Sequence, residues 1–505
     1  MKEREKNYLK WLPLILILVF LSFSYAQKID LTNSDIGRHI KNGELFIEEG
    51  KIISTNFYSY TEKDYSLVTH HWAYGPFVYS IWKLGGFKLL SIINILFCLL
   101  TFILFFSIAK EKGNHKLAIL LSVVLIPLII LRKGIRPEII SYFLLAIYYF
   151  LLTKFKDKKI NYKKLLWILI PLQIIWVNTH LFFIFGISII SFFTIDSFIN
   201  KKEDLKKYLI LLGSIIVVSL VNPHFLKGLL EPLLIFKEYG YLIAENMGVI
   251  FMQKRNFSHI YLFFEFLFLL GFISFFISKK SFKKNILNIL LFIFFGILAW
   301  KMIRNLAIFG LILIPILSEN LKGIYDKIKN KKQIKKILIS SLIIFIFILG
   351  GLNYFSMNSG KGIGLIETNQ NSFKFFKENN LEGPIFNNYD LGSYIIFNLF
   401  PQEKVFVDNR PEAYSTNFFE NIYVPMQEDE ETWKEYEKKY NLNIIYFNRH
   451  DLTPWAQKFL IERIKDSEWI PVYVDNFTII YLKNDEKNRE IIEKFELPKK
   501  IFTIN

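Results

Sequence analysis

Residues 87–109 read FKLLSIINILFCLLTFILFFSIA, an apolar run with a single charged side chain, Lys88, near its start. At 1.5 Å per helical residue, such a run can cross the roughly 30 Å hydrocarbon core of a bilayer. Similar runs recur through the first 352 residues, and the whole chain is 52% hydrophobic with 52 phenylalanines. The sequence therefore predicts a polytopic membrane protein.

Apolar runs of this kind predict a bundle of about eleven transmembrane helices. The predicted spans are Trp11–Gln27, Phe87–Ala109, Leu117–Leu131, Pro137–Thr153, Leu165–Val177, Leu181–Phe198, Tyr208–Val221, Ile260–Ser278, Ile286–Trp300, Leu306–Leu317 and Ile337–Leu352. The first span also has the basic start, apolar centre and Ser24-Tyr25-Ala26 end of a cleavable signal peptide. Cleavage there would leave the orientation of every other span unchanged.

The net charge of +17 is concentrated in short lysine clusters between the apolar runs. These clusters occupy alternate connections, namely Lys2–Lys10, Lys110–Lys116, Lys154–Lys164, Lys201–Lys207, Lys279–Lys284 and Lys322–Lys336. Because cytoplasmic loops carry the excess of lysine and arginine, the N-terminus is predicted to be cytoplasmic and the segment after Leu352 extracytoplasmic. Dispersed clusters argue against nucleic-acid binding. The only cysteine, Cys98, excludes a disulfide framework.

The expected fold is mainly α. Residues 1–352 form a transmembrane domain that includes an external loop at 28–86, and residues 353–505 form a small extracytoplasmic α/β domain. Short apolar runs in the tail predict strands at Pro384–Phe386, Lys404–Val407, Asn443–Phe447, Pro471–Val474 and Thr478–Leu482. A helix is expected at Trp455–Ile464, and a hairpin turn at Asp475-Asn476.

The first external loop contains candidate acid–base and metal-binding side chains. Asp35 at the outer face of the membrane could act as a general base, or it could cap the helix that follows it. His39 lies four residues after Asp35, a spacing that a metal pair can use. His70 and His71 could point toward a metal or hydrogen-bond at the interface beside Trp72. The sequence therefore allows a divalent cation and leaves its identity open.

Two predicted external turns carry cations against the positive-inside bias. Arg132 and Arg136 lie in the connection between the third and fourth spans, and Lys301 and Arg304 lie in the connection between the ninth and tenth. Cations near the hydrocarbon boundary usually meet an anion, and the planar guanidinium matches phosphate oxygens. A phosphate on a lipid carrier is therefore one expected ligand. The alternative is that these side chains snorkel toward the headgroups of ordinary membrane lipids.

Three further polar residues are predicted at external ends of spans: Asn178, His180 and Asn222. Asparagine before proline and asparagine in a tight turn terminate helices well. The same side chains could instead bind sugar hydroxyls or a phosphate.

The order of these motifs resembles that of bacterial GT-C type glycosyltransferases, polytopic enzymes that use lipid-phosphate sugars, and in particular a branch with a C-terminal extracytoplasmic domain. The matching segments are Asp35-Ile36-Gly37-Arg38-His39 with Gly43, Trp72, Arg136-Pro137, Trp176–His180, Asn222-Pro223, Phe386–Tyr394 and Val405–Glu412. The resemblance covers nearly the whole chain.

The resemblance implies a catalytic carboxylate at the position of Asp35. It further implies inverting sugar transfer from a polyprenyl-phosphate donor to an envelope glycan, lipid or protein. The residues expected to bind the donor phosphate are Arg132, Arg136, Lys301 and Arg304. The candidate substrate-binding residues are Arg38, His39, His70, His71, Asn178, His180 and Asn222. The branch often has an acidic residue where His71 stands and an aromatic one where His224 stands, which leaves metal dependence open.

Other functions remain compatible with the sequence. A transporter or flippase of a lipid-linked or anionic substrate would place ionisable groups near the bilayer midplane, where only Glu265 is a candidate. A non-catalytic envelope assembly protein would use its external domain instead. In the tail, Asp390, Asp408 and Arg410 could bind an acceptor or form a buried ion-paired network. The enzyme hypothesis expects Asp35 and the external cations to meet at the outer leaflet.

Overall fold

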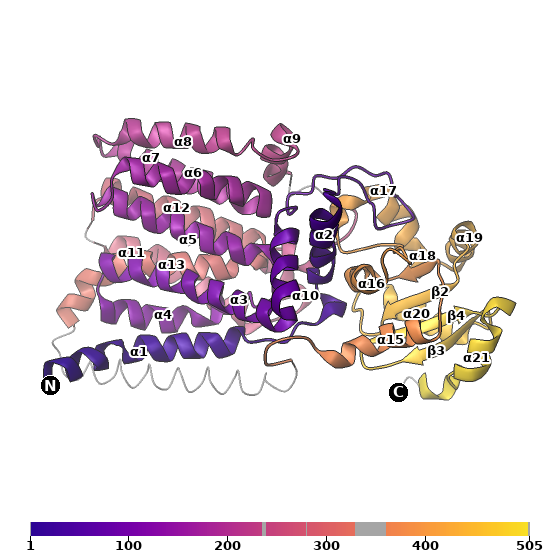
Figure 1. Ribbon diagram of the computed structural model, residues 1–505. Helices are drawn as coiled ribbons and strands as arrows, with labels where there is room; N and C mark the ends of the chain where they lie inside the picture. Colours follow the sequence, from indigo (N-terminus) through magenta and orange to yellow (C-terminus); the bar gives the residue numbers. More distant parts are fainter. Residues whose placement is uncertain (1, 235–238, 279, 329–359, 503–505) are drawn as a thin grey trace. The chain divides into compact units, whose positions relative to one another are not determined.

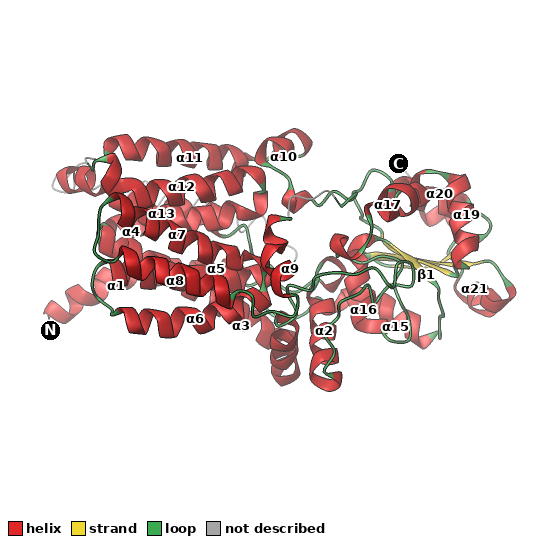
Figure 2. Cartoon of the chain, turned by 90° about the horizontal axis from the view of Figure 1, so that it is seen from above, coloured by secondary structure: helices red, strands yellow, loops and turns green. Residues whose placement is uncertain are grey.

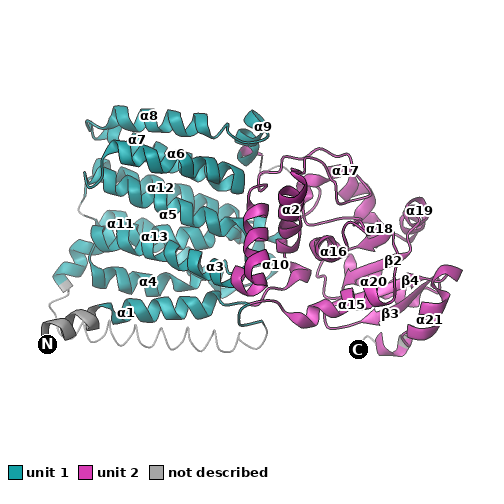
Figure 3. Cartoon of the chain, viewed as in Figure 1, with its two compact units in different colours: residues 1–27, 91–232, 243–363 teal, residues 28–90, 233–242, 364–505 magenta. Residues whose placement is uncertain are grey.

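The computed structural model describes residues 2–234, 239–278, 280–328 and 360–502. The chain divides into two compact units (Figure 3). Unit 1 comprises Met1–Gln27, Ser91–Pro232 and Ile243–Ile363, and unit 2 comprises Lys28–Leu90, Leu233–Leu242 and Gly364–Asn505. Residues 28–90 thus pack with the C-terminal residues. The proposed division of the chain at residue 352 stays a prediction.

Unit 1 is a bundle of apolar helices (Figure 1). Its helices are α1 (Lys2–Tyr25), most of α3 (Tyr74–Lys112), α4 (His115–Ile129), α5 (Pro137–Lys156), α6 (Tyr162–Thr179), α7 (Ile184–Ile199), α8 (Leu205–Val218), α9 (Phe225–Leu230), α10 (Val249–Arg255), α11 (His259–Ile277), α12 (Phe282–Lys301) and α13 (Leu306–Ile328). Each predicted span from Trp11–Gln27 to Leu306–Leu317 coincides with a helix, while Ile337–Leu352 lies outside the described residues.

The predicted polytopic helical bundle is confirmed. Among the described residues, 6 helices are long and apolar enough to cross a membrane. Helix α13 is central, since every side chain from Leu306 to Leu317 is buried. Helix α11 instead exposes a stripe of large apolar side chains that includes Phe266, Leu269 and Phe276. Exposed apolar side chains at helical spacing are what a lipid-facing surface requires.

The lysine-rich connections gather at one end of unit 1. Lys112 on α3 pairs with Glu319 on α13 at 3.0 Å, and Lys156 on α5 pairs with Asp196 on α7 at 3.0 Å. Farther along the same end, Asn200 donates a hydrogen bond to the carbonyl of Lys283 at 2.9 Å. The alternation of basic connections therefore matches the fold. Assignment of this end to the cytoplasm stays a prediction.

Unit 2 contains a sheet of four strands in the order β1-β2-β4-β3. Its strands are β1 (Ile385–Asn387), β2 (Ile444–Asn448), β3 (Trp469–Val474) and β4 (Thr478–Lys483). Strands β1 and β2 are parallel, with Phe386 opposite Ile445, and β4 runs antiparallel to both β2 and β3. Its helices are α2 (Ile36–Glu49), α15 (Asn371–Glu378), α16 (Gly392–Leu399), α17 (Thr416–Phe418), α18 (Pro425–Glu428), α19 (Glu430–Tyr440), α20 (Ala456–Lys465) and α21 (Arg489–Phe495).

Helices cover both faces of this sheet, which Figure 2 shows almost edge-on. On one face, Phe386 packs edge-on against Trp433 of α19 and Phe459 of α20. On the other, Tyr446 packs against Tyr394 of α16 and donates a hydrogen bond to Ser372 at 2.7 Å. The predicted C-terminal α/β domain is therefore present. Helix α20 and the hairpin turn at Asp475-Asn476 also lie where they were expected.

One predicted strand, Lys404–Val407, is wrong. Val405 makes only an isolated parallel bridge with Ser59 of the first external loop. Its backbone N–H donates to the carbonyl of Tyr58 at 3.1 Å, and its carbonyl accepts from the N–H of Tyr60 at 3.2 Å. The backbone groups that a sheet would use are thus satisfied by residues from a distant part of the sequence, and the first external loop is joined to the C-terminal residues.

Helix α2, which follows Asp35 and contains Gly37 to Gly43 of the first external loop, belongs to unit 2. It packs against α16, where a Cβ on Gly37 would lie 2.9 Å from Cβ of Phe397. On another side it meets the start of α3, where a Cβ on Gly43 would overlap the backbone of Gly75. Glycine at both positions allows the close backbone approach that fixes α2 in place. The side chains at the beginning of α2 are consequently held on a rigid support.

Candidate functional site

Asp35 lies at the N-cap position of α2, but its side chain makes no capping hydrogen bond. Its Oδ2 lies 3.7 Å from Nε2 of His39, and its side chain is 25% exposed. Asp30 behaves differently, because its Oδ1 accepts from the N–H of Thr32 at 3.0 Å and from Nδ2 of Asn369 at 2.6 Å. The capping alternative for Asp35 is therefore not supported by the geometry, whereas Asp30 has a structural role.

His39 is buried beside Asp35, with 1% of its surface exposed. Burial, followed by the positive charge of Arg38, lowers the pKa of His39 to about 4. Its Nδ1 has no hydrogen-bond partner among the described residues. The ring lies edge-on to Tyr74 at 4.9 Å and to His71 at 5.6 Å. His39 is consequently a neutral imidazole near pH 7.

His70 and His71 lie on the same side of α2 as His39. Their ring centroids are 3.8 Å apart, and Nδ1 of His70 lies 3.2 Å from the carbonyl of Val68. Asp35 and the three predicted histidines are thus in one region of unit 2. Within the described part of the chain, however, no group of three or more His, Cys, Asp or Glu side chains is arranged to hold a metal ion.

Arg38 is buried in the same region. It is 6% exposed, and its Nε donates to Oδ1 of Asn409 at 3.3 Å. Nearby, Arg410 binds Asp408 through two hydrogen bonds of 2.6 and 2.7 Å, and Arg410 also donates to Asn56 at 3.0 Å. Since Asp408 is fully buried, this geometry supports the structural alternative for the pair. Asp390, in contrast, is exposed.

The predicted external cations of unit 1 meet two glutamates. Arg132 donates from Nε and Nη2 to Oε2 of Glu138, at 2.7 and 2.6 Å. A second carboxylate, Glu245, accepts through Oε2 from Nη2 of Arg132 at 2.7 Å and from Nη1 of Arg136 at 2.6 Å. Nη1 of Arg304 lies 3.7 Å from Oε1 of Glu138. Three guanidiniums from two separate connections thus lie against the same two carboxylates.

Neither glutamate was among the residues predicted from the sequence. Glu138 was detectable in principle, since it lies in the first turn of α5, directly after Arg136-Pro137. A carboxylate there faces the positive end of the helix dipole. Glu245 gave no comparable signal. It lies in a 3₁₀ turn, Ala244–Asn246, inside a long connection, more than a hundred residues from the arginines that it binds.

Arg304 is the least satisfied of the three arginines. Its side chain is 13% exposed, and its Nε and Nη2 have no hydrogen-bond partner within the described ranges. The guanidinium carbon lies 5.4 Å from the ring centroid of Phe182, and the carbonyl of Arg304 accepts from Tyr142 at 3.1 Å. Lys301, by comparison, is exposed at the end of α12.

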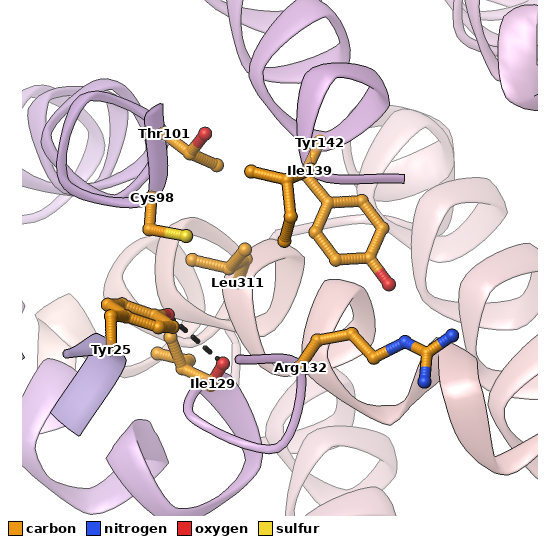
Figure 4. Close-up of a pocket in the computed structure, with 8 residues that line it drawn as sticks. All are labelled: Tyr25, Cys98, Thr101, Ile129, Arg132, Ile139, Tyr142 and Leu311. Atoms are coloured by element: carbon orange, nitrogen blue, oxygen red, sulfur yellow. Dashed lines mark hydrogen bonds between the residues drawn. The ribbon is translucent and has the colours of Figure 1, made fainter. Parts of the chain in front are cut away.

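A small pocket adjoins the arginine cluster (Figure 4). Its volume of about 10 Å³ is enough for roughly one water molecule. The lining residues are Tyr25, Cys98, Thr101, Ile129, Arg132, Ile139, Tyr142 and Leu311. The guanidinium of Arg132 points away from Cys98 and Thr101, and Tyr25 donates to the carbonyl of Ile129 at 3.1 Å. Arg132 therefore lines a mostly apolar pocket, while its guanidinium binds Glu138 and Glu245.

The remaining predicted residues of unit 1 have structural partners. The Asn178 amide donates to the carbonyls of Ile174 and Val221, each at 2.8 Å. Nδ1 of His180 lies 2.9 Å from Oγ of Ser141. The side chain of Asn222 closes its own turn, accepting from the N–H of His224 at 2.9 Å. These contacts favour helix termination over ligand binding for the three residues.

The chain matches no known sequence-family profile and no curated protein sequence. Its fold is similar to that of solved membrane proteins. One is the oligosaccharyltransferase AglB from Archaeoglobus fulgidus, in complex with an inhibitory peptide and a dolichol-phosphate. The TM-score is 0.63 at 12% identity, over 95% of this chain and 75% of that one.

A second similar structure is ArnT from Cupriavidus metallidurans, bound to undecaprenyl phosphate. The TM-score is 0.50 at 11% identity, over 93% of this chain and 97% of that one. AglB and ArnT are both GT-C proteins, so the predicted GT-C fold is confirmed. At these identities the likeness concerns the fold of the chain.

Proposed function

We propose that this chain is a membrane glycosyltransferase that moves a sugar from a polyprenyl-phosphate donor to an extracytoplasmic acceptor. The observation that carries the proposal is the cluster of Arg132, Arg136 and Arg304 at the end of the bundle opposite the lysine-rich connections. The two similar structures, AglB and ArnT, contain a dolichol-phosphate and undecaprenyl phosphate respectively. A hexosyl or pentosyl group is the expected cargo.

In this proposal the guanidiniums bind the phosphate of the carrier lipid. Arginine offers a planar pair of donors to phosphate oxygens, and the pairing strengthens where water is partly excluded. As the sugar leaves, negative charge grows on the phosphate oxygen. The positive charges of the guanidiniums lower the energy of that state. Lys301 supplies a further positive charge at the same connection as Arg304.

Asp35 is proposed as the general base. Its carboxylate takes the proton from an acceptor hydroxyl while that oxygen forms a bond to the anomeric carbon. The bond between the anomeric carbon and the phosphate oxygen breaks on the opposite side, and its electron pair leaves with the polyprenyl phosphate. The sugar is transferred with inversion. Neutral His39, 3.7 Å from Asp35, does not neutralise the carboxylate as a cation would.

The proposed topology places the N-terminus in the cytoplasm and unit 2 outside it. The lysine-rich end of unit 1 then faces the cytoplasm, where cationic connections are favoured. The arginine cluster then lies at the outer leaflet, within reach of a carrier lipid. The acceptor is an envelope glycan, lipid or protein.

A transporter is the less supported alternative. Glu265, the one candidate for a charge inside a span, accepts a hydrogen bond from Gln253 of α10 at 2.9 Å. Its carboxylate is therefore engaged by a neighbouring short helix. The other charged side chains of the predicted spans lie near the span ends, as an interfacial enzyme requires.

The test compares Asp35→Asn with a matched control, Asp30→Asn, in the full-length protein. Each substitution removes one negative charge from the same loop. The assay follows release of radiolabelled sugar from a panel of hexosyl and pentosyl polyprenyl phosphates in membrane vesicles. We expect Asp35→Asn to lose about 10²- to 10⁴-fold in transfer with unchanged expression, the range for losing a general base. Asp30→Asn should lower stability but keep most activity, and full transfer by Asp35→Asn would remove it from the mechanism.

A further inference from the structure

Glu245 holds two arginines through a single oxygen atom. Its Oε2 lies 2.7 Å from Nη2 of Arg132 and 2.6 Å from Nη1 of Arg136. One anionic oxygen between two guanidiniums is the arrangement that a bound phosphate also makes. The carboxylate therefore occupies a position that has the chemistry of an anion-binding subsite.

The two glutamates of the cluster differ in how firmly they are fixed. The side chain of Glu138 is 6% exposed and belongs to the first turn of a long helix, α5. The side chain of Glu245 is 31% exposed and belongs to a 3₁₀ turn of three residues. Glu138 is thus a permanent partner of Arg132, while Glu245 can leave by rotation of its own side chain at a smaller desolvation cost.

The backbone next to Glu245 stays anchored when the side chain moves. The carbonyl of Met247, two residues later, accepts from the N–H of Ile303 at 3.0 Å. At Gly248, a Cβ would lie 2.9 Å from the carbonyl of Trp300. The turn that carries Glu245 is therefore attached to the α12–α13 connection, which also carries Arg304. A side-chain exchange at Glu245 does not require this connection to unfold.

We infer that Glu245 acts as an internal substitute for phosphate, bridging Arg132 and Arg136 and giving way to the phosphate of the carrier lipid when that lipid binds. This inference rests on the proposed function. When the Glu245 side chain leaves, Arg132 and Arg136 lose the negative charge that they share, and their Nη2 and Nη1 atoms can donate to another anion. The vacated subsite then fits a lipid-linked phosphate.

The exchange also bears on product release. A sugar-loaded phosphodiester carries one negative charge, whereas the released phosphomonoester carries about 1.5 to 2 at pH 7. The product therefore binds the arginines more tightly than the donor does. A carboxylate that returns to Arg132 and Arg136 competes with the product and speeds its departure. Glu245 would then be a positioning residue that sets affinity without touching the sugar.

The experiment measures binding of undecaprenyl phosphate to the full-length protein in phosphatidylcholine nanodiscs. Glu245→Gln keeps the shape of the side chain and removes the competing charge. A matched control is Glu203→Gln, which removes the same charge from an exposed residue that the described structure leaves without an ion pair. We expect Glu245→Gln to lower Kd about 3- to 10-fold, as removal of a competing internal state should, while Glu203→Gln leaves Kd unchanged.

Steady-state transfer separates this role from a purely structural one. Glu245→Gln should lower KM and also lower kcat, because product leaves more slowly. Glu245→Asp, which keeps the charge on a shorter stem, should fall between the wild type and Glu245→Gln. Inorganic phosphate should compete more strongly in Glu245→Gln than in the wild type. An equal gain in affinity for phosphatidylglycerol nanodiscs would overturn the assignment to the carrier lipid.

The outcomes distinguish the two levels of the proposal. If wild-type binding depends on Arg132 but Glu245→Gln binds equally or more weakly, the inference about Glu245 is wrong and the proposed function stands. If neither the wild type nor any folded variant binds undecaprenyl phosphate, the proposed function fails together with the inference. Thermal unfolding of each variant establishes that it is folded.

Discussion

Replacement of Arg410 by methionine should sharply destabilise unit 2. Arg410 is 4% exposed, and it neutralises Asp408 through hydrogen bonds of 2.6 and 2.7 Å. Without the guanidinium, the side-chain hydrogen bond that the described residues still give the fully buried Asp408 comes from a neutral group, the Tyr414 hydroxyl at 3.3 Å. Breaking a buried pair by removing one partner costs about 3–5 kcal/mol, a large share of the 5–15 kcal/mol that typically stabilises a domain.

Pulse proteolysis of the full-length protein in urea measures this change. The C-terminal fragment is followed by immunoblot, so that unfolding of unit 2 is read separately from unit 1. With an m value of about 2 kcal/mol per molar urea, a loss of 4 kcal/mol lowers the midpoint by about 2 M. The double variant Asp408→Leu with Arg410→Met should recover about half of this loss, because neither position then holds an unpaired buried charge. Asn56 still loses its partner, which limits the recovery.

Two results would refute this reasoning. An unchanged midpoint in Arg410→Met would show that the pair does not stabilise unit 2. A double variant that is less stable than either single one would show that the net worth of the pair exceeds its desolvation cost. Loss of sugar transfer with an unchanged midpoint would instead assign Arg410 to ligand binding.

Three further predictions concern packing, pH and the lysine-rich end. Gly43→Val should destabilise unit 2 by about 2 kcal/mol through overlap with Gly75, and the urea midpoint of unit 2 measures the loss. His39 has a pKa of about 4 in the folded protein and about 6.5 when unfolded, so the unfolded state binds the extra proton between these values. Stability should fall as pH drops from about 6.5 to 4, by on the order of 3 kcal/mol, and His39→Gln should flatten this slope in pH-dependent unfolding. Glu319→Ala should destabilise unit 1 by about 3 kcal/mol because Lys112, whose side chain is 15% exposed, loses its carboxylate partner, whereas Lys280→Ala, at a side chain 40% exposed, should cost less than about 1 kcal/mol in thermal unfolding.

Most of the membrane fold could be predicted because its signal is local. A transmembrane span is recognised from the length and apolarity of one continuous segment, and each predicted span among the described residues coincides with a helix. Strands of the C-terminal sheet were predictable for the same reason. The structure of Lys404–Val407 could not be predicted in this way. Its composition favours a strand, but the backbone of Val405 pairs with Tyr58 and Tyr60, more than 300 residues earlier. Long-range pairing of this kind leaves no local pattern.

The candidate sites show the same limit. The sequence singled out Asp35 and Arg132 by residue type and expected position. It could not show that Asp30 accepts a hydrogen bond from the distant Asn369 while Asp35 makes no capping bond. It also could not show that Glu245 bridges two arginines from a distant connection. Partners supplied by tertiary packing, rather than residue types, decide which polar side chains remain available for chemistry.

The two ends of unit 1 use cations in different ways, and the difference favours ligand exchange at the arginine end. At the lysine-rich end, one carboxylate holds two lysines, as Asp196 holds Lys156 and Lys202 at 3.0 and 2.5 Å. Asp196 is itself 3% exposed, so an incoming anion would have to displace a buried group. At the other end, Glu245 is ten times more exposed and binds donors with fixed planar geometry. A phosphate can replace it there without leaving a carboxylate stranded in the interior, whereas an exchange at Asp196 would carry that cost.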